Sequence, residues 1–479
     1  MTHDLKPYPK YKDSGVPWLG KVPEHWEVRK LRNILKEVTE RNRPDLPLLS
    51  VVREKGVILR DMINEGENHN FIPDDLTNYK VVRSGQFTMN KMKAWQGSYG
   101  ISCHDGIVSP AYFVFEVDGV SGDYFHAAIR SKAYVSFFNQ ASDGVRIGQW
   151  DLSKVRMREM PFFVPPLPEQ SAIVRYLDYV DRRIRRYIRI KERLIKLLEE
   201  QKQAIIHHAV TRGLDPNVRL KPSGVEWLGE IPEHWEVVRL KEVTTPIEQG
   251  WSPQCDAQPA ADHEWGVLKV GCVNHDTFFN EGQNKKLPPT LKPIPELQIR
   301  DGDILVSRAN TRELLGLAAL VVSPREKLML CDKLFRFRAK QKRAIPRFLI
   351  YAMRQKTSRV QIESSTNGAS DSMQNIGQAV VRNLVLALPP LDEQKHIIVA
   401  LALDVARIMI AIAAAQREIA LLREYRTRLI ADVVTGKLDV RQVAARLPEE
   451  SEAPVELDVP AGEETDEIAD LENTNEEET

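Results

Sequence analysis

The chain has 479 residues, 42 % hydrophobic and 28 % charged, which predicts more than one globular domain. Its 67 Lys and Arg residues equal its 67 Asp and Glu residues in number, but fourteen of the acidic residues and none of the basic ones follow Pro448. The first 448 residues therefore carry 67 basic against 53 acidic side chains. Such a basic body favours a polyanionic partner such as nucleic acid.

The sequence gives no sign of secretion or of membrane insertion. The first twelve residues are polar and lack the apolar core of a secretory signal, and no uninterrupted apolar run is long enough to span a membrane. The four cysteines, Cys103, Cys255, Cys272 and Cys331, show no paired spacing. We therefore expect a reduced, cytoplasmic protein without a membrane partner.

A short motif near the N-terminus occurs a second time in the middle of the chain. Residues 14–31 and 223–240 are identical at thirteen of 18 positions, with a shift of 209. The shared core reads Pro23-Glu24-His25-Trp26-Glu27 in the first copy and Pro232-Glu233-His234-Trp235-Glu236 in the second. We call it the His–Trp motif; its histidines stand beside tryptophans and are expected to pack rather than to transfer protons.

A variable segment follows each copy of this motif, at about 30–163 and 239–387. Each segment mixes short strand-like runs, such as 112–117 and 303–306, with helical runs at 123–138 and 346–363. Asp-Gly pairs mark turns between these runs. An α/β domain of about 140 residues is expected for each segment.

A long helix is predicted after each variable segment. Proline pairs at 165–166 and 389–390 end the preceding strand, an acidic residue follows in the first helical turn, and Gly213 and Gly436 stand where each helix should stop. The two helices superpose with a constant shift of 224 residues. The sequence between the His–Trp motif and the helix is therefore fifteen residues longer in the second half.

Apolar residues recur along both helices in alternating steps of three and four, which is typical of a coiled-coil seam. Asp181, Lys191, Lys202 and Arg426 interrupt the stripe. The predicted seam residues are Leu177, Ile184, Ile188, Ile195, Leu198, Leu401, Val405, Ile408, Ile412, Ile419 and Leu422. Because neither helix can bury this stripe on a small domain, we expect the two to pair. The repeat favours an antiparallel pair with approximate twofold symmetry, although the linker 214–222 also permits a parallel one.

These observations predict an α/β (α+β) protein in which two globular domains are joined by two long helices. The expected parts are an N-terminal motif with the first domain (1–163), a first helix (164–213), a second motif with the second domain (214–387), a second helix (388–447) and an acidic, disordered tail (448–479).

The doubled motifs resemble the specificity subunit of type I restriction–modification systems over residues 14–441. The resemblance implies that the variable segments are target recognition domains, each reading one half of a split double-stranded DNA site, and that the helices are the conserved spacer. It also implies docking of two methyltransferase subunits and of motor-nuclease subunits. On that basis S-adenosylmethionine, ATP and Mg²⁺ are expected on the partner subunits and no cofactor on this chain.

The sequence carries no recognisable catalytic motif. We find no Asn-Pro-Pro-aromatic or Asp-Pro-Pro-aromatic tetrapeptide of an amino-methyltransferase and no phosphate-binding loop. The nuclease-like Glu-x-Lys spacings at Glu200 and Glu393 fall inside the predicted helices, and Cys272 and His275 lack a second metal-ligand pair. We therefore expect neither an enzyme nor a metal site.

Polar and basic loops at matching places in the two domains are the candidates for DNA contact. Aligning Gly85 with Gly302 places Asn90 on Ser307 and Lys91 on Arg308, directly after a predicted strand in each domain. The candidates are Asn90, Lys91, Lys93, Trp95, Arg146 and Gln149 in the first domain and Ser307, Arg308, Asn310, Thr311, Asn367 and Gln374 in the second. An ordinary polar turn is the alternative for each loop.

Two further questions stay open at the level of sequence. The arginine run at 182–186 could be a solvated helix face or a surface for DNA backbone or an acidic partner. The chain as a whole could serve a restriction–modification enzyme, act as a free-standing bipartite DNA-binding regulator, or, against the missing motifs, be an enzyme by itself.

Overall fold

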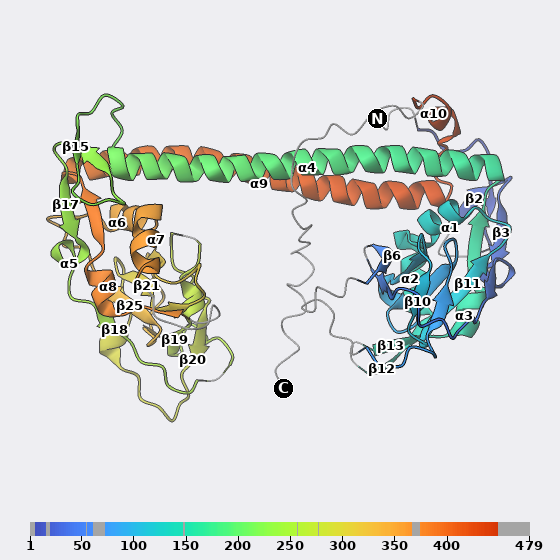
Figure 1. Ribbon diagram of the computed structural model, residues 1–479, viewed down its shortest axis with the longest axis horizontal. Helices are drawn as coiled ribbons and strands as arrows, with labels where there is room; N and C mark the ends of the chain where they lie inside the picture. The colour runs from blue at the N-terminus through green and yellow to red at the C-terminus, as the bar shows by residue number, and fades with distance from the viewer. Residues whose placement is uncertain are drawn as a thin grey trace. The chain divides into compact units, whose positions relative to one another are not determined.

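The computed structural model describes residues 5–15, 20–53, 55–60, 72–146, 149–255, 257–275, 277–365 and 374–448. The chain divides into two compact units, Met1–Ile188 with Ala420–Thr479, and Arg189–Ile419. The long helices α4 (Leu167–Arg212) and α9 (Leu391–Val434) run through both units, so each unit contains a part of each helix (Figure 1). The acidic tail after Pro448 lies outside the described residues.

A four-stranded antiparallel sheet forms the centre of unit 1. Its order is β4-β11-β8-β9, and the helices α1 and α2 close its core, in which Phe87, Tyr99, Phe125 and Phe138 are fully buried. The bounds are β4 Leu35–Glu37, β8 Phe87–Asn90, β9 Tyr99–Ile101, β11 Tyr112–Val117, α1 Gly122–Ile129 and α2 Lys132–Gln140. Strand β11 is the run predicted at 112–117.

Five two-stranded ladders surround this sheet in unit 1, all antiparallel. The ladder of β3 with β14 matters most for function, because β14 leads directly into α4. The bounds are β1 Tyr11–Asp13 with β2 Lys21–Pro23, β3 Glu27–Lys30 with β14 Pro161–Val164, β5 Leu49–Val52 with β6 Gly56–Leu59, β7 Lys80–Val82 with β10 Gly106–Val108, and β12 Ser142–Arg146 with β13 Gln149–Leu152. Helix α3, Lys154–Glu159, precedes β14.

Unit 2 repeats this architecture. Its four-stranded sheet has the order β18-β25-β21-β23, in which β21 takes the place of β8 and β25 that of β11. The equivalent elements are β18 Glu248–Gln249, β21 Ile304–Ser307, β23 Ala318–Leu320, β25 Leu334–Phe337, α6 Pro346–Met353, α7 Lys356–Glu363, α8 Gln378–Arg382, and the ladders β15 Leu220–Pro222 with β16 Glu230–Pro232 and β17 Glu236–Arg239 with β27 Val385–Leu388.

Beyond these equivalent elements, the described part of unit 2 has a three-stranded sheet, whereas that of unit 1 has the two ladders β5–β6 and β7–β10. Strands β19 Gly266–Leu268, β20 Asn284–Lys286 and β24 Leu328–Met329 form three strands with a separate apolar core. That core buries Cys272 and Cys331, and burial raises the pKa of the Cys331 thiol to about 12. None of the four cysteines forms a disulfide bond.

Each of the two predicted helical runs in the variable segments is in fact a pair of short helices. The run at 123–138 breaks between α1 and α2 at Arg130, and the run at 346–363 breaks between α6 and α7 at Arg354. In both corners the next residue, Ser131 or Gln355, is extended, which turns the second helix back onto the same core. The guanidinium of Arg130 donates to the carbonyl oxygen of Tyr99 in β9 at 3.2 Å. The guanidinium of Arg354 donates to the carbonyl oxygen of Ala318 in β23, the equivalent strand of unit 2, at 2.8 Å.

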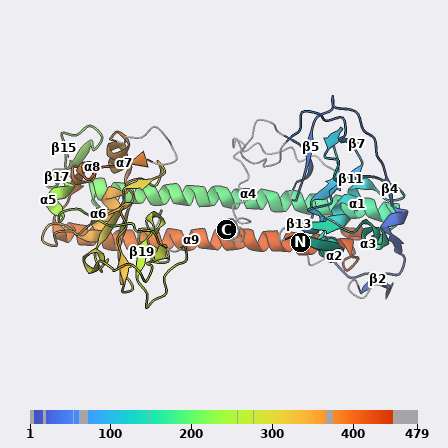
Figure 2. The same cartoon turned by 90° about the horizontal axis from the view of Figure 1, so that it is seen from below.

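Helices α4 and α9 lie antiparallel in each unit, as predicted for the fold (Figure 2). In unit 1, Arg426 near the end of α9 pairs with Asp181 near the start of α4; in unit 2, Lys191 of α4 contacts Glu418 of α9 at 2.7 Å. Of the predicted seam residues, Leu177, Ile184, Leu401, Ile408, Ile412 and Ile419 are buried, and Ile188, Ile195, Leu198, Val405 and Leu422 are half-buried. By length and composition α9 could also cross a membrane, and 22 % of its most apolar window is buried.

Candidate nucleic-acid interface

The first candidate loop, at 90–96, packs against the hairpin β12–β13. Asn90 is the last residue of β8; its amide donates to the Tyr112 hydroxyl at 3.2 Å and its carbonyl oxygen accepts from the Met92 backbone at 3.1 Å. The Asn90 side chain is buried and therefore shapes the loop. Lys91 holds the hairpin through Asp151, with 3.4 Å between Nζ and Oδ2.

Trp95 is a second contact between this loop and the hairpin. It lies on the single-turn helix η2 (Ala94–Gln96), and its ring stacks on that of Trp150 with 5.5 Å between the centroids. Its indole nitrogen is buried and has no hydrogen-bond partner among the described residues. Lys93 is exposed. Arg146 and Gln149 are backbone partners in the ladder between β12 and β13. The structure thus brings the six candidates of the first domain into one loop and one hairpin.

The second candidate loop, at 307–312, has the same place in unit 2. Ser307 ends β21 as Asn90 ends β8, and it is fully buried, with its hydroxyl bonded to the carbonyl oxygen of Leu314. Arg308 donates to the carbonyl oxygen of Asp332 at 3.2 Å. Gly85 and Gly302, which anchored the alignment of the two loops, both have a positive φ, 87° and 81°, in the turn before the strand.

The segment that follows α7 pairs with this second loop, and the hairpin that follows α2 packs against the first loop. Strand β22 (Ala309–Asn310) pairs with β26 (Gln374–Asn375), which places Asn310 opposite Gln374. The Nδ2 atom of Asn310 is buried without a hydrogen-bond partner among the described residues, whereas Thr311 is exposed. Asn367 lies outside the described residues.

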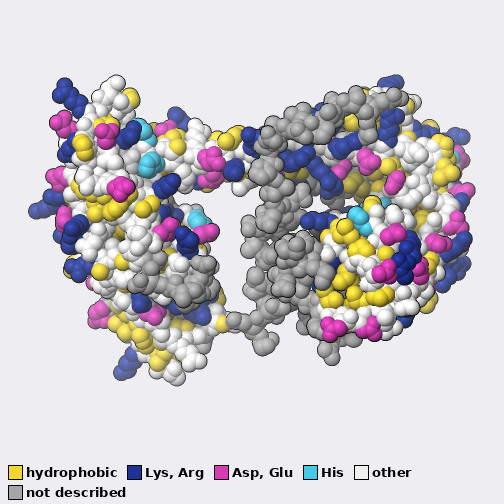
Figure 3. Space-filling model, in the orientation of Figure 1, with side chains coloured by type: hydrophobic (Ala, Val, Ile, Leu, Met, Phe, Trp, Pro, Cys, Tyr) yellow, Lys and Arg dark blue, Asp and Glu magenta, His cyan; other side chains and the backbone are white. Residues whose placement is uncertain are grey.

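On the face of the molecule drawn in Figure 3, charge alone does not single out one region. In the view of Figure 3, Lys and Arg side chains are scattered over both units among acidic ones. Several of the basic side chains are neutralised locally, as in the pairs Lys154–Glu37 and Arg156–Asp143. The matching loops, and not a large basic patch, therefore define the candidate interface.

The start of each long helix carries a Glu-Gln pair that fastens the unit together, which the sequence did not predict. Glu169 is 5 % exposed and accepts hydrogen bonds from the Tyr8 hydroxyl at 2.6 Å, from His25 at 2.7 Å and from the Trp26 indole at 2.9 Å. Burial and this bond to the Glu169 carboxylate raise the pKa of Tyr8 well above its ordinary value, so that the phenol keeps its proton. The histidine of the His–Trp motif thus has a polar partner as well as a packing role.

The same contacts recur in unit 2. Glu393 accepts from His234 at 2.7 Å and from the Trp235 indole at 3.1 Å. The neighbouring glutamine fastens the recognition domain: the side-chain oxygen of Gln170 accepts from the backbone of Ser121 before α1, and that of Gln394 from Ile345 before α6, both at 2.8 Å. A signal was present in the sequence, because the Glu-Gln pair and the His–Trp motif recur together in both halves.

The nuclease-like and metal-like positions of the sequence lie in the described part of the chain. No group of three or more His, Cys, Asp and Glu side chains there could hold a metal ion. Glu393, one of the two nuclease-like positions, is engaged by the His–Trp motif, and Glu200 lies within α4.

Comparison with known proteins points in one direction. Residues 232–416 match the family described as "Type I restriction modification DNA specificity domain". The chain is 32 % identical over 207 residues to the type I restriction enzyme EcoEI specificity subunit of Escherichia coli, a match that covers 43 % of this chain and 34 % of that one. It is 24 % identical over 439 residues to the MjaVIII specificity subunit of Methanocaldococcus jannaschii, which covers 88 % of this chain and 95 % of that one.

The fold is shared with a solved structure described as "Structural basis underlying complex assembly and conformational transition of the type I R-M system". The superposition has a TM-score of 0.60 at 18 % identity and covers 86 % of this chain and 98 % of that chain. At this identity the likeness concerns the fold alone.

Proposed function

We propose that the chain is a type I restriction–modification specificity subunit, the subunit that selects the DNA target for such an enzyme, because its family match and its relatives are of this kind. In this role it performs no chemistry itself. It binds double-stranded DNA and assembles with modification and restriction subunits, which supply the methyl transfer and the cleavage. Its place of action is the cytoplasm, where the DNA and those subunits are.

One observation carries the proposal: the chain contains the same reading unit twice. In each unit a sheet of identical strand order ends in a polar loop, and a Glu-Gln pair fastens that domain to a long helix. Two recognition domains on one chain read two half-sites, and their linkage raises the overall affinity through effective concentration. Because the two loops differ in sequence and unit 2 has a three-stranded sheet where unit 1 has two separate ladders, the half-sites differ, and the target is asymmetric and bipartite.

The loops at 90–96 and 307–312 are the proposed reading elements. Their exposed members, such as Lys93 and Thr311, contact DNA, whereas the buried Asn90 and Ser307 hold the loops in shape. Lys91 and Arg308 have both a local partner and access to solvent, and are suited to phosphate contact once DNA competes for them.

Helix α9 offers a surface for the partner subunits in unit 2. Val399, Leu403 and Ile410 lie on one side of the helix and are 61 %, 58 % and 68 % exposed. We call these three residues the apolar face of α9. Large apolar side chains that are exposed in a row at helical spacing indicate a helix-binding partner. We assign this face to a modification subunit and propose two such subunits per chain, with S-adenosylmethionine, ATP and Mg²⁺ bound on the partners.

Methylation mapping tests the proposed function. The genome of a host that carries the modification subunit is sequenced for methylated bases with this chain present and with it deleted. A single split motif with two unlike halves, methylated only when the chain is present, is expected. Unchanged methylation would favour the free-standing regulator instead, for which tight and specific DNA binding by the isolated chain is the positive sign.

A further inference from the structure

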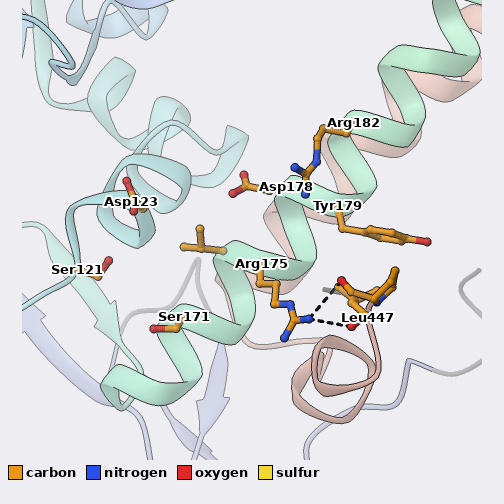
Figure 4. A pocket seen from close by; sticks show the side chains of 10 residues that line it. Ser121, Asp123, Ser171, Arg175, Asp178, Tyr179, Arg182 and Leu447 are labelled. Atoms are coloured by element: carbon orange, nitrogen blue, oxygen red, sulfur yellow. Dashed lines mark hydrogen bonds between the residues drawn. The ribbon is translucent and has the colours of Figure 1, made fainter. Parts of the chain in front are cut away.

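A groove of about 490 Å³ in unit 1 separates helix α4 from the end of the described chain. Arg175, Asp178, Tyr179 and Arg182 line it from successive turns of α4, and Leu447 and Pro448 close its other side (Figure 4). Arg175 bridges the groove, because one guanidinium nitrogen donates to the carbonyl oxygens of Leu447 at 2.8 Å and of Pro448 at 3.4 Å. The chain after Pro448 therefore begins beside this stretch of α4.

The adjoining side of α4 is rich in arginine. Arg175, Arg182 and Arg186 are spaced by seven and four residues, so they lie on one side of the helix, and all three are exposed. We call them the arginine face. Between residues 175 and 188 the helix has five arginines and two aspartates, and one of the aspartates, Asp181, is paired with Arg185 and Arg426. With Asp178 and with Asp123 of α1, which also line the groove, this surface holds five arginines against three aspartates, so its net charge is positive.

The fold does not require this charge. The residues that match the arginine face at the shift of 224 are Val399, Ala406 and Ile410 of α9, so the same helical positions are apolar in the second copy. At these three positions, arginine therefore occurs on α4 and not on α9. Because only the first of the two repeated helices carries the arginine face, we expect its ligand to be one that the second helix does not bind.

The 31 residues from Glu449 to Thr479 are such a ligand. They hold fourteen acidic residues and no Lys or Arg, and nothing in the first half of the chain corresponds to them. By the general scaling for a random coil, 31 residues span about 30 Å, whereas Arg175 and Arg186 are only about 16 Å apart along the helix. Tethering beside the groove gives the tail an effective concentration on the order of millimolar at the arginine face.

We propose that residues 449–479 bind the arginine face of α4 as an internal polyanion. The contact screens this part of the helix from other polyanions, so nucleic acid that lacks the target sequence is excluded from it. A specific complex, which gains base contacts elsewhere, displaces the tail. Because the contact is electrostatic and solvent-exposed, it weakens as salt rises.

Photo-crosslinking in the full chain tests the contact without DNA. With p-benzoylphenylalanine in place of Leu457, irradiation at low salt is expected to join the tail mainly to α4 peptides that contain the arginine face. Replacing all fourteen tail carboxylates by their amides, or adding about 1 M salt, at which the Debye length falls to about 3 Å, should abolish that product. Cross-links that fall on other elements, or that survive both treatments, would overturn the proposal.

A pair of charge-matched variants locates the site. Arg182→Gln with Arg186→Gln should lower the cross-link yield at least about fivefold, while Lys10→Gln with Lys36→Gln, which removes the same charge from exposed positions elsewhere in unit 1, should leave it unchanged. An equal loss in both variants would show attraction to the net charge alone and refute a defined site.

A binding measurement then tests the consequence. The full chain with an amidated tail should bind duplex DNA of arbitrary sequence about tenfold more tightly than the unmodified chain, since a millimolar internal competitor is removed. Unaltered affinity would refute the screening role, and the cross-link would report separately on the contact. Neither result depends on whether the proposed target selection is correct.

Discussion

At the scale of single residues, Glu169 stabilises the packing of the N-terminal segment and the His–Trp motif against the start of α4. Its carboxylate satisfies the buried Tyr8 hydroxyl and Trp26 indole, so Glu169→Leu leaves two buried donors without partners and should lower the free energy of unfolding by about 2–4 kcal/mol. Glu393→Leu in unit 2 orphans only the Trp235 indole, since His234 is half exposed, and should cost about 1–2 kcal/mol. Denaturant unfolding of the full chain measures both.

A double mutant separates the hydrogen bonds from the packing at this position. Tyr8→Phe removes one donor, so Tyr8→Phe combined with Glu169→Leu should cost less than the sum of the two single changes. Strict additivity would mean that the Tyr8–Glu169 bond contributes nothing.

His126 makes unit 1 sensitive to acid. Its Nδ1 atom accepts the Ile101 backbone N–H at 3.0 Å, and burial together with Arg130 lowers the pKa of the imidazole to about 4. Because the ordinary pKa is near 6.5, the unfolded chain binds a proton first, and stability that is complete above pH 6.5 is lost as the pH falls toward 4. The loss should approach about 3 kcal/mol.

The control for this pH effect is a side chain that accepts the same bond without titrating. His126→Asn should flatten the pH dependence between 4 and 6.5 in thermal unfolding, whereas His104→Asn, at an exposed position, should leave the slope as it is. A slope that persists in His126→Asn would assign the acid sensitivity to another group.

At the level of elements, the helix pair is fixed in register by its polar interruptions. Asp181 and Arg426 each interrupt an apolar stripe, and they meet in unit 1. The positions that match them at the shift of 224 are Val405 and Lys202, so the second half lacks this pair. Asp181 is 22 % and Arg426 41 % exposed, so a double-mutant cycle with alanine should give a coupling of about 1 kcal/mol.

A more exposed pair provides the comparison. Lys191 and Glu418 are 28 % and 53 % exposed, and their coupling should be nearer 0.3 kcal/mol by the usual value of about 0.2–1 kcal/mol for surface pairs. Replacing both Asp181 and Arg426 by leucine should preserve or raise the melting temperature, because an apolar pair suits the seam better than a charged one. A large drop would mean that the ion pair stabilises the helices and does more than set their register.

Periodic and repeated features could be predicted from the sequence, whereas contacts between distant residues could not. The seam was predicted from the apolar spacing, the antiparallel pairing was favoured by the repeat, and the equivalence of the loops after β8 and β21 came from aligning Gly85 with Gly302. The corners at Arg130 and Arg354 were missed, since a break that lets both halves of a helical run face one core depends on tertiary packing and leaves little local signal. Likewise, the burial of Asn90 and Ser307 is decided by the strands that surround them.

On the scale of the whole molecule, the proposed assembly with a modification subunit depends on the apolar face of α9. Val399→Asp with Ile410→Asp places two charges on this face and should weaken association with the modification subunit by about 100-fold or more, as for residues at the centre of an interface. Stability should change by no more than about 0.5 kcal/mol, since both side chains are exposed. Val155→Asp, at a 75 % exposed position on α3, is the matched control for size exclusion of the complex.

The length of the helix pair should set the number of unread base pairs in the target. Helix α4 has 46 residues and α9 has 44. One heptad added to each helix where the chain passes between the units, after Ile188 and after Ile419, lengthens the pair by about 10 Å and turns it by only about 20°. At about 3.4 Å per base pair, methylation mapping should find the same two half-sites about three base pairs further apart. A heptad added to α4 alone puts the seams out of register and should abolish methylation. An unchanged gap in the doubly extended chain would mean that something other than helix length measures the target.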